Sequence, residues 1–172
     1  MAMKGKGYLK TTWAFQERPV ASAKLNDWDD RIESALVLLH YLLNQVWGGG
    51  DGVLRNAADE LEVQAAEPAG LSVTVHPGYA FIGRFAYALT ESMAAPSVQP
   101  PSGQPRIDLV VAELGGWTAG VVTGEEDADP EPPEPPQETL PLAELYLRPG
   151  MNHIANEDDG NNGYIIDVRT FL

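Results

Sequence analysis

The chain contains no cysteine, and no lysine follows Lys24. The absence of cysteine excludes disulfides, thiolate metal sites and cysteine nucleophiles. No run approaches the ~18 consecutive apolar residues that a membrane-spanning helix needs, and no apolar stretch follows the first lysines as it does in a secretory signal. We therefore expect a soluble chain that is made in the cytoplasm and has no membrane partner.

Acidic residues dominate the charge, because 25 Asp and Glu stand against 11 Lys and Arg, giving a net charge of -14. A field of this sign repels nucleic acid, so we expect no nucleic-acid partner. Positive charge gathers in residues 1–24, where Glu17 is the sole acid. We predict an extended arm here, anchored to a partner or to the protein's own body by Tyr8, Trp13 and Phe15; a frayed terminus is the alternative.

Motifs for catalysis are missing from the sequence. The three histidines, His40, His76 and His153, belong to no H-E-x-x-H helix, and the chain has neither a G-x-S-x-G elbow nor a P-loop. We therefore predict no enzyme activity, no cofactor and no small-molecule substrate. Residues 156–163 cluster carboxylates and amides, and their spacing favours a solvated turn over a Ca²⁺ site.

One segment, roughly residues 26–47, has the periodicity of a helix. Asn26 is the predicted N-cap, acidic residues fill the predicted first turn, and the glycines at 48–50 end the helix. Apolar residues within it are spaced alternately three and four apart, which is the pattern of a coiled-coil seam over three heptads. The seam consists of Leu25, Trp28, Ile32, Ala35, Leu39, Leu42 and Val46.

A second apolar stripe, made of Leu36, Leu43 and Trp47, flanks this seam. The apolar surface is therefore wider than a two-stranded coiled coil requires. We predict that residues 25–50 form an apolar helical segment that self-associates, with trimer as the expected state. The alternative is a single helix that lies on its own sheet, which also has a wide apolar face.

Beyond residue 50 the periodicity becomes that of strands, with alternation and turn residues between short apolar runs. Gly83-Arg84 and Gly115-Gly116 predict the turns of two hairpins. The resulting fold class is mainly β with one N-terminal helix, a small antiparallel β-sandwich or barrel over residues 51–172. Strands are predicted at residues 61–65, 71–75, 79–82, 85–89, 106–114, 117–123, 140–147 and 164–172.

Residues 125–138 interrupt this pattern with acids and prolines. Proline cannot donate to a strand ladder, and the like charges repel one another. We expect an extended, solvated loop of polyproline type. Its acids and prolines are Glu125, Glu126, Asp127, Asp129, Glu131, Glu134, Glu138, Pro130, Pro132, Pro133, Pro135 and Pro136.

The order of motifs resembles a structural module of tail-fibre, baseplate and other peripheral tail proteins of tailed phages and prophages. The resemblance covers roughly residues 20–172. It rests on the succession of KLNDW at 24–28, VHPGYAFIG at 75–83, RIDLVV at 106–111, the acidic Pro-Pro loop at 124–136, PLAELY at 141–146 and IIDVR at 165–169.

This resemblance implies a virion structural protein that is assembled in the host cytoplasm and belongs to the tail. Members are structural and often trimeric, so the implied partners are further copies of the chain and other tail or baseplate proteins. Long fibres continue into a receptor-binding tip, whereas this sequence ends at Leu172. We therefore expect a short adaptor, plug or baseplate subunit.

The matched residues also carry physical expectations. Val73, Val75, Phe81 and Ile82 should fill the core or an interface, and Gly78 and Gly83 suit positive φ in turns. Arg106 and Asp108 share one face of their strand, as do Asp167 and Arg169. If the two strands are neighbours, we expect cross-strand Arg–Asp ion pairs.

A carbohydrate-binding or host-receptor-binding module is the alternative function. Modules of this kind expose an aromatic platform. Trp117 with Tyr79, Tyr87 or Tyr146 would supply one, although aromatics at alternating strand positions are more often part of a core.

Overall fold

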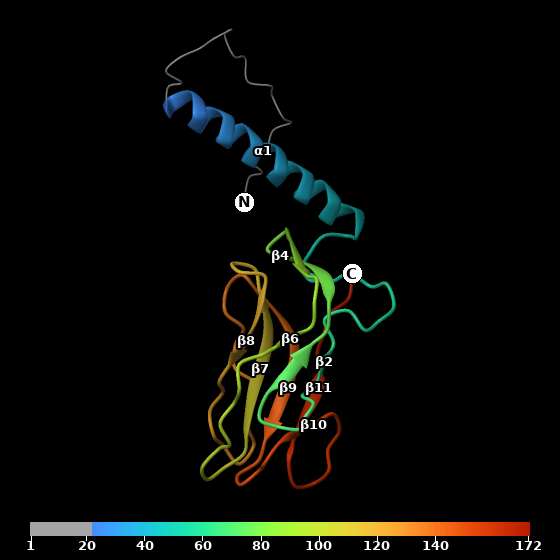
Figure 1. Cartoon of the computed structure of the whole chain (residues 1–172), viewed down its shortest axis with the longest axis vertical. Helices are drawn as coiled ribbons and strands as arrows, with labels where there is room; N and C mark the ends of the chain where they lie inside the picture. Colours follow the sequence, from blue (N-terminus) through green and yellow to red (C-terminus); the bar gives the residue numbers. More distant parts are fainter. Residues whose placement is uncertain (1–21) are drawn as a thin grey trace. The chain divides into compact units, whose positions relative to one another are not determined.

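The computed structural model describes residues 22–172, and the chain divides into two compact units, Met1–Gly49 and Gly50–Leu172. In the described residues, the first unit holds α1 (Ser22–Val46) and the second holds every strand (Figure 1). The predicted fold class, mainly β with a single N-terminal helix and antiparallel sheets, is confirmed. We call residues 50–172 the β-domain.

The predicted end of α1 is confirmed, but its predicted start is wrong. At the end, Gly48 (φ 87°) and Gly49 (φ 78°) adopt left-handed backbone, and the Gly49 N–H donates to the carbonyl of Asn44 at 3.0 Å. This is a Schellman cap, which glycine favours because it lacks a Cβ. At the start, the chain is already helical from Ser22, so Asn26 is not an N-cap and the following acids are not in the first turn.

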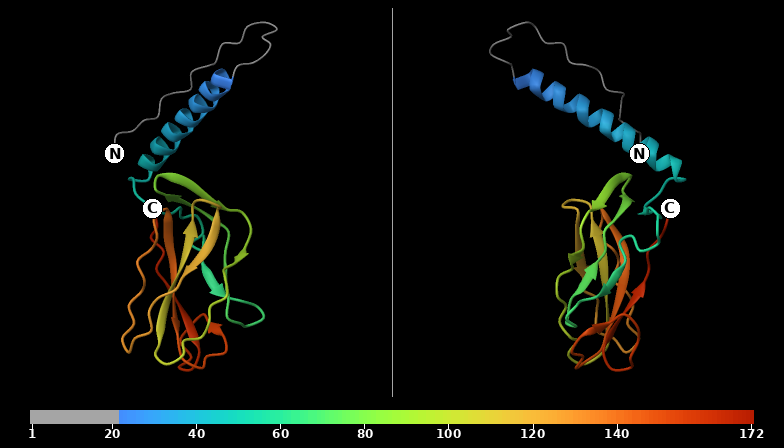
Figure 2. Two further views of the ribbon diagram at one scale, coloured as in Figure 1. Left: turned by 90° about the vertical axis from the view of Figure 1, so that its left-hand side faces the viewer. Right: turned by 45° about the vertical axis from the view of Figure 1, so that its right-hand side comes forward.

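The largest sheet of the β-domain has five strands in the order β10-β11-β9-β7-β8 (Figures 1 and 2). All neighbours are antiparallel except β10 and β11. A bulge between Val110 and Val111 shifts the register of β7 against β9. The strands are β7 (Arg106–Glu113), β8 (Thr118–Val122), β9 (Thr139–Leu147), β10 (Ile154–Ala155) and β11 (Gly163–Asp167).

Two three-stranded sheets complete the domain, in the orders β1-β4-β5 and β2-β3-β6. The predicted hairpin around Gly83-Arg84 is confirmed, since both residues have positive φ (57° and 74°), as a two-residue hairpin turn of type I′ requires. The strands are β1 (Gly52–Val53), β2 (Val63–Ala65), β3 (Val73–Val75), β4 (Gly78–Ile82), β5 (Phe85–Leu89) and β6 (Met93–Ala94).

All three sheets contribute side chains to one core. Val75, Ile82, Leu142 and Leu145 are fully buried in it, and Tyr87 is buried at 1% exposure. The four residues predicted for the core or an interface, Val73, Val75, Phe81 and Ile82, are all buried. The core faces of the strands thus form the sandwich that the alternating pattern predicted.

Gly78 is required for a different reason from the predicted one. It lies in β4 without positive φ, so it is not a turn glycine. A Cβ at this position would lie 2.7 Å from the backbone nitrogen of Leu61 and 2.9 Å from the Cβ of Glu60. Close approach of two backbones, rather than a turn, therefore demands glycine here.

Candidate functional site

The predicted seam forms a continuous apolar stripe along α1, because a three–four spacing returns to nearly the same face of a helix. Five of its residues are between 41% and 74% exposed, namely Leu25, Trp28, Leu39, Leu42 and Val46. Ile32 and Ala35 are half-buried. Leu36 and Leu43 beside them are also exposed. An apolar stripe of this length is a surface that burial against a partner would stabilise.

The four residues predicted to form ion pairs do so, but each arginine pairs with the aspartate two residues away in its own segment and not across two strands. Arg106 Nε lies 2.7 Å from Asp108 Oδ1, and Arg169 Nη2 lies 2.7 Å from Asp167 Oδ2. The predicted cross-strand pairing is wrong because β9 lies between β7 and β11 in the sheet. Residues two apart in extended backbone share a face, so Arg106 reaches Asp108 within β7, and Arg169, just beyond the end of β11, reaches Asp167.

The two pairs differ in burial and in their further partners. Asp108 is 1% exposed and also accepts the N–H of Gly124 at 3.0 Å. Arg169 donates to the carbonyl of Glu60 at 2.7 Å, and its hydrogen bond to Asp167 lowers the pKa of that carboxyl. Both pairs thus tie a strand to a distant loop, which gives them structural roles.

The acidic loop at 125–138 runs along β7 and is fixed near both ends of that strand. The N–H of Asp127 donates to the carbonyl of Pro105, and the N–H of Leu114 donates to the carbonyl of Glu138. No helix or strand interrupts the loop in the structure. Most of it is exposed, with Pro130 and Pro133 half-buried. The expected extended, solvated loop is present, but it lies along the sheet.

Glu126 holds the start of this loop. Its carboxylate accepts the backbone N–H groups of Ser102 (2.8 Å), Gly103 (3.0 Å) and Gln104 (3.3 Å). These donors, led by the N–H of Ser102, stabilise the charged form and lower the pKa of Glu126 to about 2. Glu126 is therefore an anchor between two loops.

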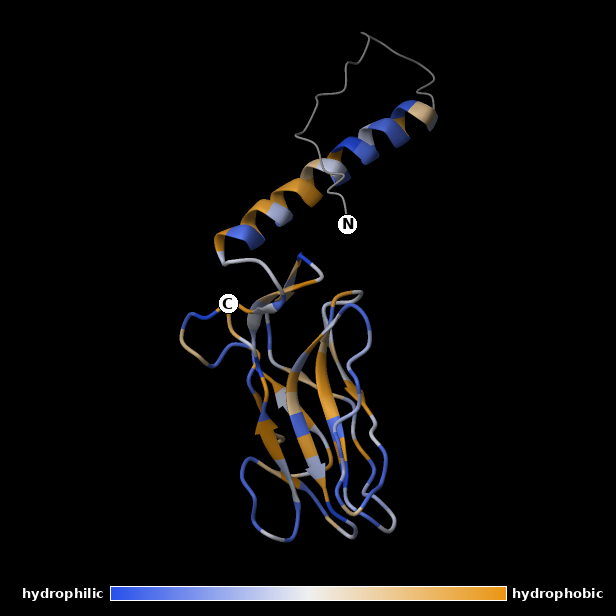
Figure 3. Ribbon diagram, turned by 180° about the vertical axis from the view of Figure 1, so that it is seen from behind, coloured by the Kyte–Doolittle hydropathy of each residue, from blue (hydrophilic) through white to orange (hydrophobic). Residues whose placement is uncertain are grey.

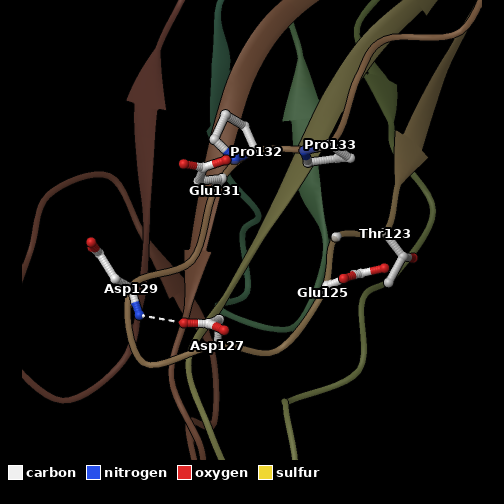
Figure 4. A pocket seen from close by; sticks show the side chains of 8 residues that line it. Thr123, Glu125, Asp127, Asp129, Glu131, Pro132 and Pro133 are labelled. Atoms are coloured by element: carbon white, nitrogen blue, oxygen red, sulfur yellow. Dashed lines mark hydrogen bonds between the residues drawn. The ribbon is translucent and has the colours of Figure 1, made fainter.

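An open hollow of about 570 Å³ lies within the acidic loop (Figure 4). Its lining includes Glu125, Asp127, Asp129 and Glu131, with Pro132 and Pro133 beside them. Asp127 accepts the N–H of Asp129 at 3.0 Å and so stabilises the loop itself. The hollow attracts positive charge. However, no three His, Cys, Asp or Glu side chains in residues 22–172 are arranged to hold a metal ion.

The loop at 156–163 is held together by its own carboxylates. Asp159 accepts the N–H groups of Asn161 (2.8 Å) and Asn162 (2.7 Å), and the Asn162 bond contributes most to lowering its pKa to about 2. Asp158 pairs with Arg148 at 2.9 Å. The structure therefore places these oxygens in the hydrogen bonds of a turn.

Of the aromatic residues named for a binding platform, two are exposed and two pack within the β-domain. Tyr87 is 1% exposed and donates its hydroxyl to the carbonyl of Thr118, and burial raises its pKa to about 12. Tyr146 stacks on Tyr164 at 5.2 Å. Tyr79, on β4, and Trp117, in the turn between β7 and β8, are 56% and 57% exposed.

Two further residues that fix loops of the β-domain, Glu60 and Arg148, were not predicted from the sequence. Glu60 accepts the N–H groups of Asn56, Ala57 and Ala58, and the guanidinium of Arg148 lies 5.2 Å from the ring centroid of Tyr164. Turn carboxylates of this kind are signalled locally by Asp, Asn and Gly clusters. The arm residues Tyr8, Trp13 and Phe15 lie outside the described residues.

Comparisons with protein-family models, with characterised proteins and with solved structures find no significant match. Within the described part of the chain, no helix is long and apolar enough to cross a lipid bilayer.

Proposed function

We propose that this chain is a structural subunit of a tailed-phage particle, located in the tail or baseplate or at a fibre attachment. In this proposal it forms a homotrimer through α1 and joins neighbouring tail proteins. The observation that carries the proposal is the exposed apolar seam of α1. The order of motifs along residues 20–172 supports the assignment to a phage tail.

A second copy of the chain suits this seam better than an unrelated surface does. A coiled-coil partner must present apolar side chains with the same alternating spacing, and an identical helix does so by construction. Leu36 and Leu43, which flank the seam, would remain exposed to solvent in a two-stranded coiled coil. A bundle of three helices buries more of these flanks, which is why we propose a trimer.

The β-domain supplies the body of the proposed subunit. Its loops are fixed by carboxylates that accept backbone N–H groups, as at Asp108, Glu126 and Asp159. Rigid loops suit a surface that must fit neighbouring proteins in an assembly. We propose that the basic arm joins such a neighbour.

The test is the presence of the chain in purified particles. In lysates of the phage or lysogen that encodes it, quantitative mass spectrometry should find the chain in the tailed-particle fraction at a fixed ratio to other tail proteins. Leu39→Asp should reduce this incorporation, whereas Asp30→Ala, an exposed change away from the seam, should not. A chain that is expressed but absent from intact particles would exclude a virion role.

The exposure of Trp117 and Tyr79 favours a glycan-binding module as a second candidate. Exposed aromatic rings bind sugar faces. Binding on a glycan array that is lost in Trp117→Ala would favour this function. An array without binding by the folded protein would exclude it.

A further inference from the structure

We propose that the helices of the assembly run parallel and in register. This inference rests on the proposed self-association through α1 and adds its direction. The seam itself does not choose a direction, because apolar residues occupy it from Leu25 to Val46. The direction follows from the residues beside the seam.

Polarity is segregated along α1. All its Asp, Glu, Lys and Arg residues lie in the first half, and the second half, from Ala35 to Val46, contains none of them. Figure 3 shows this division as a hydrophilic first half and a hydrophobic second half of the helix. The charged residues are Lys24, Asp27, Asp29, Asp30, Arg31 and Glu33.

A parallel arrangement places the charged halves of neighbouring helices together and their uncharged halves together. The flanking Leu43 then lies beside Leu38 of the neighbouring copy, and both are buried within the uncharged half of the bundle. An antiparallel arrangement instead places Asp29 of one helix beside Leu42 and Leu43 of its neighbour. A carboxylate that is desolvated without a partner costs more free energy than its neighbours' apolar contacts return. The segregation therefore favours the parallel bundle.

Charge at the flanking positions agrees with this direction. Lys24 immediately precedes the seam residue Leu25, and Asp29 immediately follows Trp28. These are the g and e positions of consecutive heptads. In a parallel coiled coil the g residue of one helix meets the e residue of the next heptad on its neighbour. Lys24 of each copy thus faces Asp29 of another copy, with opposite charges.

One consequence is that all chains leave the bundle at the same end, after Gly48–Gly50. The β-domains of one assembly are then gathered at that end. Gathered copies bind a multivalent neighbour with higher avidity than separate copies do.

Disulfide cross-linking tests the direction, and the absence of native cysteine makes the test clean. Leu25→Cys and Val46→Cys introduce one thiol at each end of the seam. In a parallel bundle, each variant cross-links to itself on mild oxidation, about tenfold more than an outward-facing Asp30→Cys control. A mixture of the two variants, one carrying a size tag, should give no product that links position 25 of one chain to position 46 of another beyond the level of the control.

The other possible outcomes contradict the parallel direction, the seam as the interface, or self-association itself. A product that links position 25 of one chain to position 46 of another above the level of the control would show that at least one helix of the assembly runs antiparallel. An oligomer without cross-links at either position would show that the seam is not the interface. A monomer by light scattering would remove the proposed self-association itself, so the two failures are distinguishable.

A charge exchange provides a second test that does not depend on cysteine. Asp29→Lys sets two positive charges against each other in a parallel bundle and should weaken association about two- to fivefold per pair. Adding Lys24→Asp to the same chain restores opposite charges and should recover most of the affinity. Failure of the double variant to recover would contradict the parallel register.

Discussion

Several single residues in this protein hold one backbone segment close to another. Gly78 permits β4 to pass close to Leu61, and the Glu126 carboxylate accepts hydrogen bonds from three backbone N–H groups of another loop. Neither role is visible in the local sequence, because each depends on a segment more than ten residues away. Gly83 was predictable, since a hairpin turn requires positive φ within its own two residues.

Gly78→Ala should destabilise the β-domain by about 1–3 kcal/mol, because the new methyl group meets the backbone nitrogen of Leu61. Urea unfolding of the two proteins measures the difference. Gly115→Ala is the matched control, since nothing lies within 4 Å of its added Cβ. Equal stability of Gly78→Ala and the control would contradict the close packing described for β4.

Glu126 makes the stability depend on acid pH. Its pKa is about 2 in the folded chain, against 4.5 as the ordinary value, so its contribution is complete above pH 4.5 and is lost as the pH falls toward 2. Glu126→Gln should lower the melting temperature at pH 7, and the two proteins should converge near pH 2. A difference that is the same at both pH values would contradict this role. Glu125→Gln, at the neighbouring exposed acid, is the control.

At the scale of elements, local rules predicted strands and turns but not their order in the sheets. Alternation located the strands, and Gly83-Arg84 and Gly115-Gly116 located the hairpin turns. The insertion of β9 between β7 and β11 was not predictable, because it depends on contacts between distant segments. For the same reason, the residues of the Arg–Asp pairs were predicted correctly, but their pairing across two strands was wrong. The helix start was misplaced because Ala23, Lys24 and Leu25 are themselves good helix formers.

Asp108 links β7 to the start of the acidic loop. Asp108→Ala leaves the largely buried Arg106 and the N–H of Gly124 without this acceptor, so we expect a loss of about 3 kcal/mol in chemical denaturation. Asp158→Ala removes an exposed partner of Arg148 and should have a much smaller effect. Similar losses in both variants would contradict the distinction between a buried and an exposed pair.

At the scale of the whole molecule, the two units contribute differently to the proposed assembly. The core of the β-domain is complete in one chain, whereas α1 leaves most of its seam exposed. An isolated helix gains most of its stability from packing of its apolar face. We therefore expect α1 to become more stable when the chain associates, and helix content to depend on protein concentration.

Leu39→Asp should break the assembly without unfolding the β-domain. Leu39 is 49% exposed at the middle of the seam, so the change removes about 2 kcal/mol of burial per chain in the complex, or about 30-fold in affinity. Sedimentation and far-ultraviolet circular dichroism measure association and strand content in one sample. Asp30→Ala should match the native chain in both. Loss of the β-signal in Leu39→Asp would show that α1 is needed for folding.

The most direct test of self-association is the absolute mass of the native chain in solution, by light scattering behind size exclusion. One chain has a mass of 18.6 kDa. We expect the native chain to form a stable particle of three times this mass, which falls to a single chain in Leu39→Asp. A native chain that elutes as a monomer at all accessible concentrations would contradict it.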